Sequence, residues 1–206
     1  MYARSTTIQA DPSRIDDGIN YVRDEVMSTL TVMDGCVGLS MMVDRGSGRC
    51  ITTTAWHDEA AMSASDTRVR ALRDRAAEVF GGTPKVDLWE IAVLHRMDQA
   101  GAGACVRAAW TRSDPDRAAQ AIETYRTTLL PAIEQLPGFR SASLLVDRQS
   151  GRAVSSVTYA DRDALEQSRE LAMSLRRSAV QENDVEVLEV AEFDLVLAHL
   201  RVPETV

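Results

Sequence analysis

The feature that most constrains the fold is an internal duplication, in which the second half of the 206-residue chain repeats the first at an offset of 103 residues. The clearest match joins Gly35–Arg49, GCVGLSMMVDRGSGR, to Gly138–Arg152, GFRSASLLVDRQSGR, which share the segments VDR and SGR. Asp11-Pro12 likewise falls on Asp114-Pro115. The sequence therefore predicts two copies of one small fold on a single chain.

The first part of each half predicts a strand followed by a helix. We expect the strands at residues 2–9 and 105–112. Each helix begins at an Asp-Pro pair, because aspartate caps the free amides and proline fits the first turn. Apolar residues then recur at spacings of three and four, which indicates one buried stripe per helix. The two stripes are Ile15, Ile19, Val22, Val26, Leu30 and Met33 in the first half, and Ala118, Ile122, Tyr125, Leu129, Ile133 and Leu136 in the second.

The rest of each half predicts a hairpin, a helix and a last strand. In the first half the hairpin strands lie near 36–43 and 50–57, around a loop that contains glycine. A second helix follows at 59–79. The last strand covers Val86–Met97, and its copy runs from about Glu186 to Arg201. The order β-α-β-β-α-β, found twice, is the ferredoxin-like arrangement.

The two halves are expected to pack together through their sheets. The last strands, LWEIAVLH and FDLVLAHL, are apolar on both alternating faces, which indicates burial on both sides. We therefore predict an α+β fold of two tandem ferredoxin-like repeats, packed sheet to sheet as a barrel within one chain. Repeat 1 covers residues 1–97, a linker covers 98–104, and repeat 2 covers 105–206.

Charge and motif content exclude several classes of partner and cofactor. The formal net charge of −8 disfavours binding to nucleic acid or to an anionic membrane surface. The sequence has neither a signal-peptide pattern nor an apolar run long enough to cross a bilayer, so we expect a cytoplasmic protein. It also lacks a CxxC pair, zinc-ligand spacing and a phosphate loop, so we expect neither metal nor cofactor.

The run from Leu130 to Glu166, LPAIEQLPGFRSASLLVDRQSGRAVSSVTYADRDALE, resembles the dimeric α+β barrel proteins, and among them the antibiotic biosynthesis monooxygenase (ABM-like) group. The first half shows the same pattern, with Trp56 at the aromatic position that ends the third strand. The resemblance implies a tandem member whose two repeats replace the usual homodimer. Members include cofactor-free quinone-forming monooxygenases, haem-degrading enzymes and many proteins without an established activity.

The chain departs from both enzyme patterns of that group. Cofactor-free monooxygenases commonly have asparagine four residues before the tryptophan, where this chain has Thr52, and Ser155 precedes Tyr159 in the second half. Haem-degrading relatives ligate iron through a helical histidine, but helices 59–79 and 161–182 contain none.

A candidate pocket face follows from the expected hairpin register in repeat 1. If Val43 lies opposite Cys50, then Met41 faces Thr52, Leu39 faces Thr54 and Val37 faces Trp56. This face is apolar with two hydroxyl groups, and it suits either a ligand pocket or a plain core that satisfies the indole N–H. The candidate substrate-binding residues are Trp56, Thr52, Thr54, Leu39, Met41 and Met62.

Methionine content also distinguishes the repeats. Seven of the eight methionines lie in the first half, and the second half has leucine at aligned places, namely Leu130, Leu144, Leu145 and Leu165. Because methionine adapts to irregular space, this favours a deformable pocket in repeat 1, with repeat 2 as a structural partner. Drift between the two copies would produce the same pattern.

Three further residues are weaker candidates. His57 is expected near Cys36, where a thiol and an imidazole could form a nucleophile or lie together by chance. His95 matches His199 on the last strands, in a metal-binding or a buried structural role. Arg4, which matches Arg107, could bind an anionic ligand, form an ion pair or lie at a solvated strand end. The catalytic residues cannot be assigned from the sequence.

The sequence leaves two functions open. One is the binding of a small hydrophobic or aromatic molecule, with cofactor-free oxidation by molecular oxygen as an extension. The other is a non-catalytic protein that binds a ligand or serves as a structural assembly unit with filled cores. In either case the barrel could associate further into a homo-oligomer.

Overall fold

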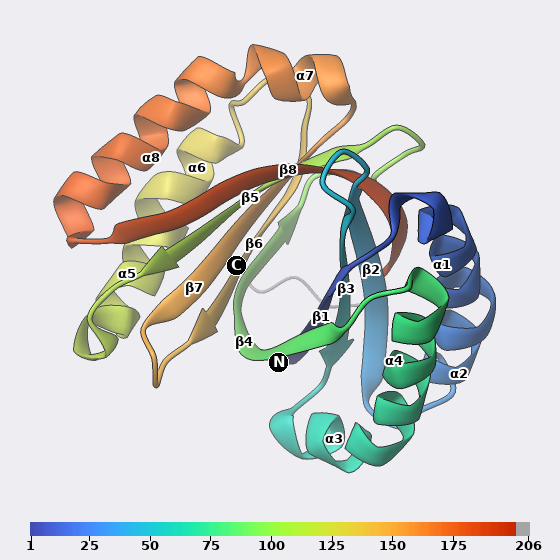
Figure 1. Cartoon of the computed structure of the whole chain (residues 1–206). Helices are drawn as coiled ribbons and strands as arrows, with labels where there is room; N and C mark the ends of the chain where they lie inside the picture. Colours follow the sequence, from blue (N-terminus) through green and yellow to red (C-terminus); the bar gives the residue numbers. More distant parts are fainter. Residues whose placement is uncertain (201–206) are drawn as a thin grey trace. The chain divides into compact units, whose positions relative to one another are not determined.

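The computed structural model describes residues 1–200, apart from the side chains of residues 181–183 and 200. It contains two compact units (Figure 1). Unit 1 consists of Met1–Trp89 with the end of the last strand from Asp194, and unit 2 consists mainly of Glu90–Phe193. The end of the predicted last strand, Arg201, and the rest of the predicted repeat 2 to residue 206 lie outside the described residues. Within residues 1–200, no helix has the length and apolar character needed to cross a membrane.

Repeat 1 has the predicted order of elements, with its first helix built from four consecutive helical pieces. The elements are β1 (Tyr2–Gln9), η1 (Pro12–Arg14), α1 (Ile15–Tyr21), the π-helical turn η2 (Val22–Val26), α2 (Met27–Leu30), β2 (Cys36–Asp44), β3 (Arg49–Trp56), α3 (Glu59–Ala64), α4 (Asp66–Phe80) and β4 (Pro84–Arg96).

Repeat 2 reproduces this order, including the π-helical turn. The elements are β5 (Cys105–Arg112), η3 (Pro115–Arg117), α5 (Ala118–Thr124), η4 (Tyr125–Leu129), α6 (Leu130–Ile133), β6 (Phe139–Asp147), β7 (Arg152–Tyr159), α7 (Arg162–Gln167), α8 (Arg169–Asn183) and β8 (Glu186–Leu200).

The helix starts form as the sequence predicts. The Asp11 side chain accepts a hydrogen bond from the Ser13 amide at 2.9 Å, with proline in the first turn, and Asp114 caps the second repeat in the same way through Asp116. Each cap satisfies an amide that the helix leaves without a partner. Local sequence thus explains where the first helix of each repeat begins.

The hairpin register of repeat 1 is confirmed except at its open end. Met41 pairs with Thr52 and Leu39 with Thr54, as predicted. The expected pairing of Val37 with Trp56 is wrong, because a bulge between Cys36 and Gly38 takes up one residue and places Cys36 opposite Trp56.

The last strand of each repeat contributes to both units. β4 pairs with β6 from Glu90 onward, and β8 pairs with β2 from Asp194 onward. The strands follow the closed order β1-β3-β2-β8-β5-β7-β6-β4, and the pairs β1–β3, β2–β3, β2–β8, β4–β6, β5–β7 and β6–β7 are antiparallel. The predicted fold class is confirmed: a barrel of two ferredoxin-like halves on one chain.

Candidate ligand-binding cavity

The core of repeat 1 is closed by an aromatic ring at the end of α4. Phe80 is 1% exposed, and a Cβ atom at Gly18 on α1 would lie only 2.0 Å from Cε1 of that ring. Ile15, one turn before Gly18, and Val69 on α4 are also buried. Glycine at position 18 therefore makes room for the ring, which fills the space between the helices and the sheet.

Repeat 2 lacks this filling. Its residues at the corresponding positions are Ala118 for Ile15, Ala121 for Gly18, Ala172 for Val69 and Asn183 for Phe80. The three alanines are half-buried, whereas the residues they match in repeat 1 are buried. The loss of an aromatic ring and several methyl groups leaves space in this repeat that the alanines do not occupy.

That space is a half-open cavity of about 160 Å³ in unit 2. The helical side of the cavity comes from α5, η4, α6 and α8, and the sheet side from β5, β6, β7 and β8. Its apolar lining is provided by Ala109, Ala118, Ala121, Ile122, Leu129, Ile133, Leu136, Leu144, Val146, Ala153, Val157, Ala172, Leu175, Ala179, Val180, Val185 and Val187.

Two hydroxyl groups form one polar point of the lining. The Tyr125 hydroxyl lies 3.1 Å from Oγ of Ser155. Complete burial raises the pKa of Tyr125 to about 12, so the phenol is neutral near pH 7 and can donate a hydrogen bond. Tyr125 and Ser155 can therefore orient a ligand without adding charge.

The carboxylate of Asp147, which also lines the cavity, is engaged in its own hairpin turn. It accepts hydrogen bonds from the backbone amides of Gln149 and Ser150 and from the Ser150 hydroxyl. These bonds lower the pKa of Asp147, and the bond from the Ser150 hydroxyl has the largest effect. Asp147 is thus an anion that holds the turn.

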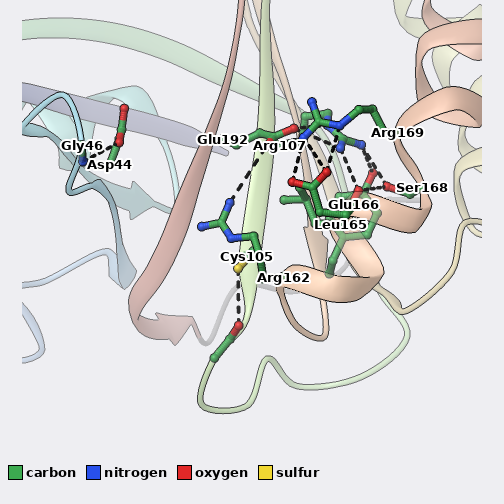
Figure 2. A network of polar contacts seen from close by, with 12 residues as sticks. Asp44, Gly46, Cys105, Arg107, Arg162, Leu165, Glu166, Ser168, Arg169 and Glu192 are labelled. Carbon is green, nitrogen blue, oxygen red and sulfur yellow. Dashed lines mark hydrogen bonds and ion pairs between the residues drawn. The ribbon is translucent and has the colours of Figure 1, made fainter.

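Arg107 on β5 joins the cavity wall to the turn between α7 and α8 (Figure 2). Its Nη1 donates to Oγ of Ser168 at 2.9 Å and to the Tyr159 hydroxyl at 3.3 Å, and its Nη2 donates to the Leu165 carbonyl at 2.8 Å. Nη2 also lies 3.0 Å from Oε1 of Glu192. With its donors engaged, Arg107 is a structural brace.

Arg4 makes the matching brace in repeat 1. It donates to Oγ of Ser65 at 3.1 Å and to the Met62 carbonyl at 2.7 Å, and it lies 3.5 Å from Oδ1 of Asp66. Desolvation lowers the pKa of Arg4, and the charge of Asp66 opposes this shift. Of the alternatives for Arg4, the structure supports the ion pair.

The predicted pocket residues of repeat 1 form part of its packed core. Trp56 is fully buried, and its indole N–H donates to Oγ1 of Thr54 at 3.0 Å. Leu39, Met41 and Met62 are buried in the same core, and Thr52 is half-buried. The 160 Å³ cavity lies in the other repeat, and a ligand role for these six residues stays a prediction.

The repeat 2 counterparts of four of those residues do line the cavity. They are Leu144 for Met41, Ser155 for Thr52, Val157 for Thr54 and Tyr159 for Trp56. The prediction thus selected a face of the repeat that borders the cavity, but in the other copy. The sequence signal for the cavity is that repeat 2 has Ala118 and Asn183 where repeat 1 has Ile15 and Phe80, a difference that methionine content does not reveal.

The histidine candidates lie in other surroundings. His57 is exposed, and only its backbone amide reaches toward the hairpin, donating to the Gly35 carbonyl. Burial raises the pKa of the Cys36 thiol, which disfavours a thiolate nucleophile there. His95 lies 3.0 Å from the Glu134 carboxylate and stacks on Phe139.

Comparison with known proteins fits this architecture. No protein-family model matches the chain. A candidate monooxygenase from Fusobacterium nucleatum superposes with a TM-score of 0.73 at 12% identity, covering 97% of this chain and 94% of that one. An anthrone oxidase-like protein superposes with a TM-score of 0.68 at 15% identity, covering 99% and 94%. The chain thus has the fold of the ABM-like dimeric α+β barrel proteins, in tandem form.

Closer relatives occur in Mycobacterium tuberculosis strain H37Rv. The uncharacterized protein Rv2557 is 55% identical over 206 residues, which cover all of this chain and 92% of the relative. The uncharacterized protein Rv2558 is 53% identical over 207 residues, with 88% of that relative covered. The chain belongs to the family of these two mycobacterial proteins.

Proposed function

We propose that this protein binds a small, mostly apolar organic molecule in the cavity of repeat 2. The observation that carries the proposal is the cavity of about 160 Å³, found where repeat 1 places Phe80 and Ile15. An apolar protein cavity of about 150 Å³ is large enough to bind benzene. A molecule with one aromatic ring, or a branched aliphatic chain of similar size, therefore suits this space.

The residues around the cavity support binding more strongly than acid–base catalysis. Cofactor-free oxidation of an organic substrate would call for a base that removes a proton, with a pKa near the working pH. Among the described lining residues, Asp147 is the only carboxylate, and its hairpin bonds lower its pKa. The pKa of Tyr125 is raised to about 12. We therefore propose a binding function first, with oxidation as the alternative.

Binding of toluene, measured by chemical-shift changes in protein NMR spectra, tests the proposal. Toluene should shift amide signals of unit 2 that surround the cavity. The double variant Ala118→Ile/Ala172→Val restores two side chains of repeat 1 and should abolish these shifts by filling the space. Ala119→Ile adds the same bulk on the exposed face of α5, as a matched control, and should leave binding unchanged. Unchanged binding to the filled variant would contradict the proposal.

A further inference from the structure

We infer that the ligand of the repeat 2 cavity is an aromatic or branched aliphatic carboxylic acid, bound through its carboxylate to the guanidinium group of Arg176. The inference rests on the proposed function and adds the chemical class of the ligand. It depends on three observations: the unpaired state of Arg176, the charge difference between the repeats, and the engagement of the nearby glutamates.

Arg176 on α8 is a half-buried cation in the wall of a mostly apolar cavity. Among the described side chains, no hydrogen bond or ion pair involves its guanidinium group. Burial lowers the pKa of Arg176, and the positive charge of Arg107 lowers it further. The guanidinium nevertheless stays protonated near pH 7, so an anion in the cavity would offset an unfavourable charge.

The matching arginine of repeat 1, Arg73, has an acidic neighbour. Arg73 contributes to the lowered pKa of Asp66 on the same helix. At the position of Asp66, repeat 2 has Arg169. The substitution replaces the carboxylate on the helix with a second cation. The negative charge that acts on Arg176 comes instead from Glu192 on β8, which opposes the lowering of the Arg176 pKa. The repeat with the open cavity is thus the one whose arginine shares its helix with a second arginine at the position of Asp66.

The glutamates close to this region are already engaged by other arginines (Figure 2). Glu192 lies 3.0 Å from Arg107, 3.2 Å from Arg169 and 3.9 Å from Arg162. Glu166 lies 2.8 Å from Arg169. Among the described residues of this cluster, the four arginines, including Arg176, carry four positive charges, and Glu166 and Glu192 carry two negative charges. The local charge balance therefore favours an anionic ligand over a neutral or cationic one.

A carboxylate is the anion that this geometry suits. The planar guanidinium fork can donate two parallel hydrogen bonds to one carboxylate. The apolar lining, which includes Ile122 and Leu175, would hold the hydrocarbon part of the same molecule. A hydrogen bond between charged groups contributes about 1.5–3 kcal/mol, which corresponds to roughly tenfold or more in affinity.

A comparison of benzoate with benzamide tests the inference, because the two probes match in size and differ in charge. At pH 7 benzoate should bind at least about tenfold more tightly than benzamide, as measured by NMR titration of the full chain. Arg176→Gln should weaken benzoate binding by about the same factor and leave benzamide binding within about twofold. Arg73→Gln changes the matching arginine of repeat 1 and should leave both affinities unchanged.

The outcomes separate the two proposals. Equal binding of both probes to the unmodified protein would overturn the carboxylate assignment and leave the proposed function standing. Binding of neither probe, with toluene still bound, would overturn the carboxylate assignment alone, and loss of toluene binding as well would overturn both. An unchanged preference for benzoate in Arg176→Gln would overturn the role of Arg176. Arg176→Lys keeps the charge but not the two-bond geometry, so its benzoate affinity should lie between those of the unmodified protein and the glutamine variant.

Discussion

The two repeats share their strands, helix starts and hairpins, and they differ in how the space between helices and sheet is filled. In repeat 1, Gly18 and Phe80 fit each other so closely that neither can change alone without disturbing the other. In repeat 2, Ala121 and Asn183 stand at those positions, and a cavity lies beside α5 and α8. A duplicated fold can thus have a filled core in one copy and a cavity in the other.

The bracing arginines differ between the repeats in a related way. Arg4 and Arg107 bind the equivalent turn, each in its own repeat. The carboxylate partner of Arg4 comes from α4, whereas that of Arg107 comes from β8. Moving the anion from the helix to the strand leaves α8 with cations at both Arg169 and Arg176. The same change that preserves the brace therefore alters the charge beside the cavity.

The largest expected effect is the loss of the ring that closes repeat 1. Phe80→Ala should lower the free energy of unfolding by about 3–5 kcal/mol, because a buried aromatic side chain is replaced by a void. Gly18→Ala should cost about 1–3 kcal/mol through overpacking against the ring. Chemical denaturation of both single variants measures these values.

The double variant Gly18→Ala/Phe80→Ala provides the control for that pair. Once the ring is gone, the added methyl group no longer meets it, so the double variant should lose less stability than the sum of the two single losses. Simple additivity would show that the close approach of Gly18 to Phe80 does not determine the packing of repeat 1.

The second effect is the contribution of Tyr125, in repeat 2, to the loss of stability at high pH. Tyr125 ionises at about pH 12 in the folded protein and near 10 when unfolded. Between these values the unfolded chain releases the phenol proton first, so the free energy of unfolding falls by up to about 1.4 kcal/mol per pH unit. Denaturation at pH 9 to 11.5 should show a shallower fall for Tyr125→Phe; equal slopes would contradict the burial of this hydroxyl.

The third effect compares the anions of the two arginine braces. Glu192→Gln should cost about 1–2 kcal/mol, because this mostly buried carboxylate faces three arginines. Asp66→Asn should cost less than about 1 kcal/mol, since the Asp66 side chain is 40% exposed. Thermal denaturation of the two variants tests the order, and a larger loss for Asp66→Asn would reverse the comparison.

The smallest effect concerns the ends of the matching helices. Gly81 ends α4 with a φ angle of 74°, whereas Asp184 ends α8 with a φ angle of 52°. Because glycine adopts this left-handed conformation without steric cost, Asp184→Gly should raise stability by about 0.5–1 kcal/mol. Gly81→Asp is the reciprocal change and should lower it. No gain for Asp184→Gly would indicate that the aspartate is already well accommodated.

Local sequence signals predicted the fold in detail. The Asp-Pro pairs and the apolar spacing gave the helix starts, and the predicted bounds of β1 and β5 coincide with those observed. The one register error arose at the bulge beside Gly38, because strand alternation alone does not reveal an extra residue. Hairpin pairings and helix caps depend on residues near in sequence, and such residues could be compared directly between the repeats.

The cavity was harder to predict because it depends on a missing contact between distant residues. Gly18 and Phe80 meet only after α1 and α4 pack together, so neither residue alone signals a closed core. Methionine content pointed to repeat 1, where Met41 and Met62 instead fill buried core positions. The alignment of the repeats contains the needed information in Ala118 and Asn183, but its meaning depends on the packing.

A crystal structure determined under xenon pressure tests the difference between the repeats most directly, because xenon occupies apolar cavities of this size. We predict a xenon atom in repeat 2 among Ala118, Ile122 and Ala172, and none in the core of repeat 1 around Phe80. A Phe80→Ala crystal should gain a second site there. Xenon in repeat 1 of the unmodified protein, or its absence from repeat 2, would contradict the account of one closed and one open repeat.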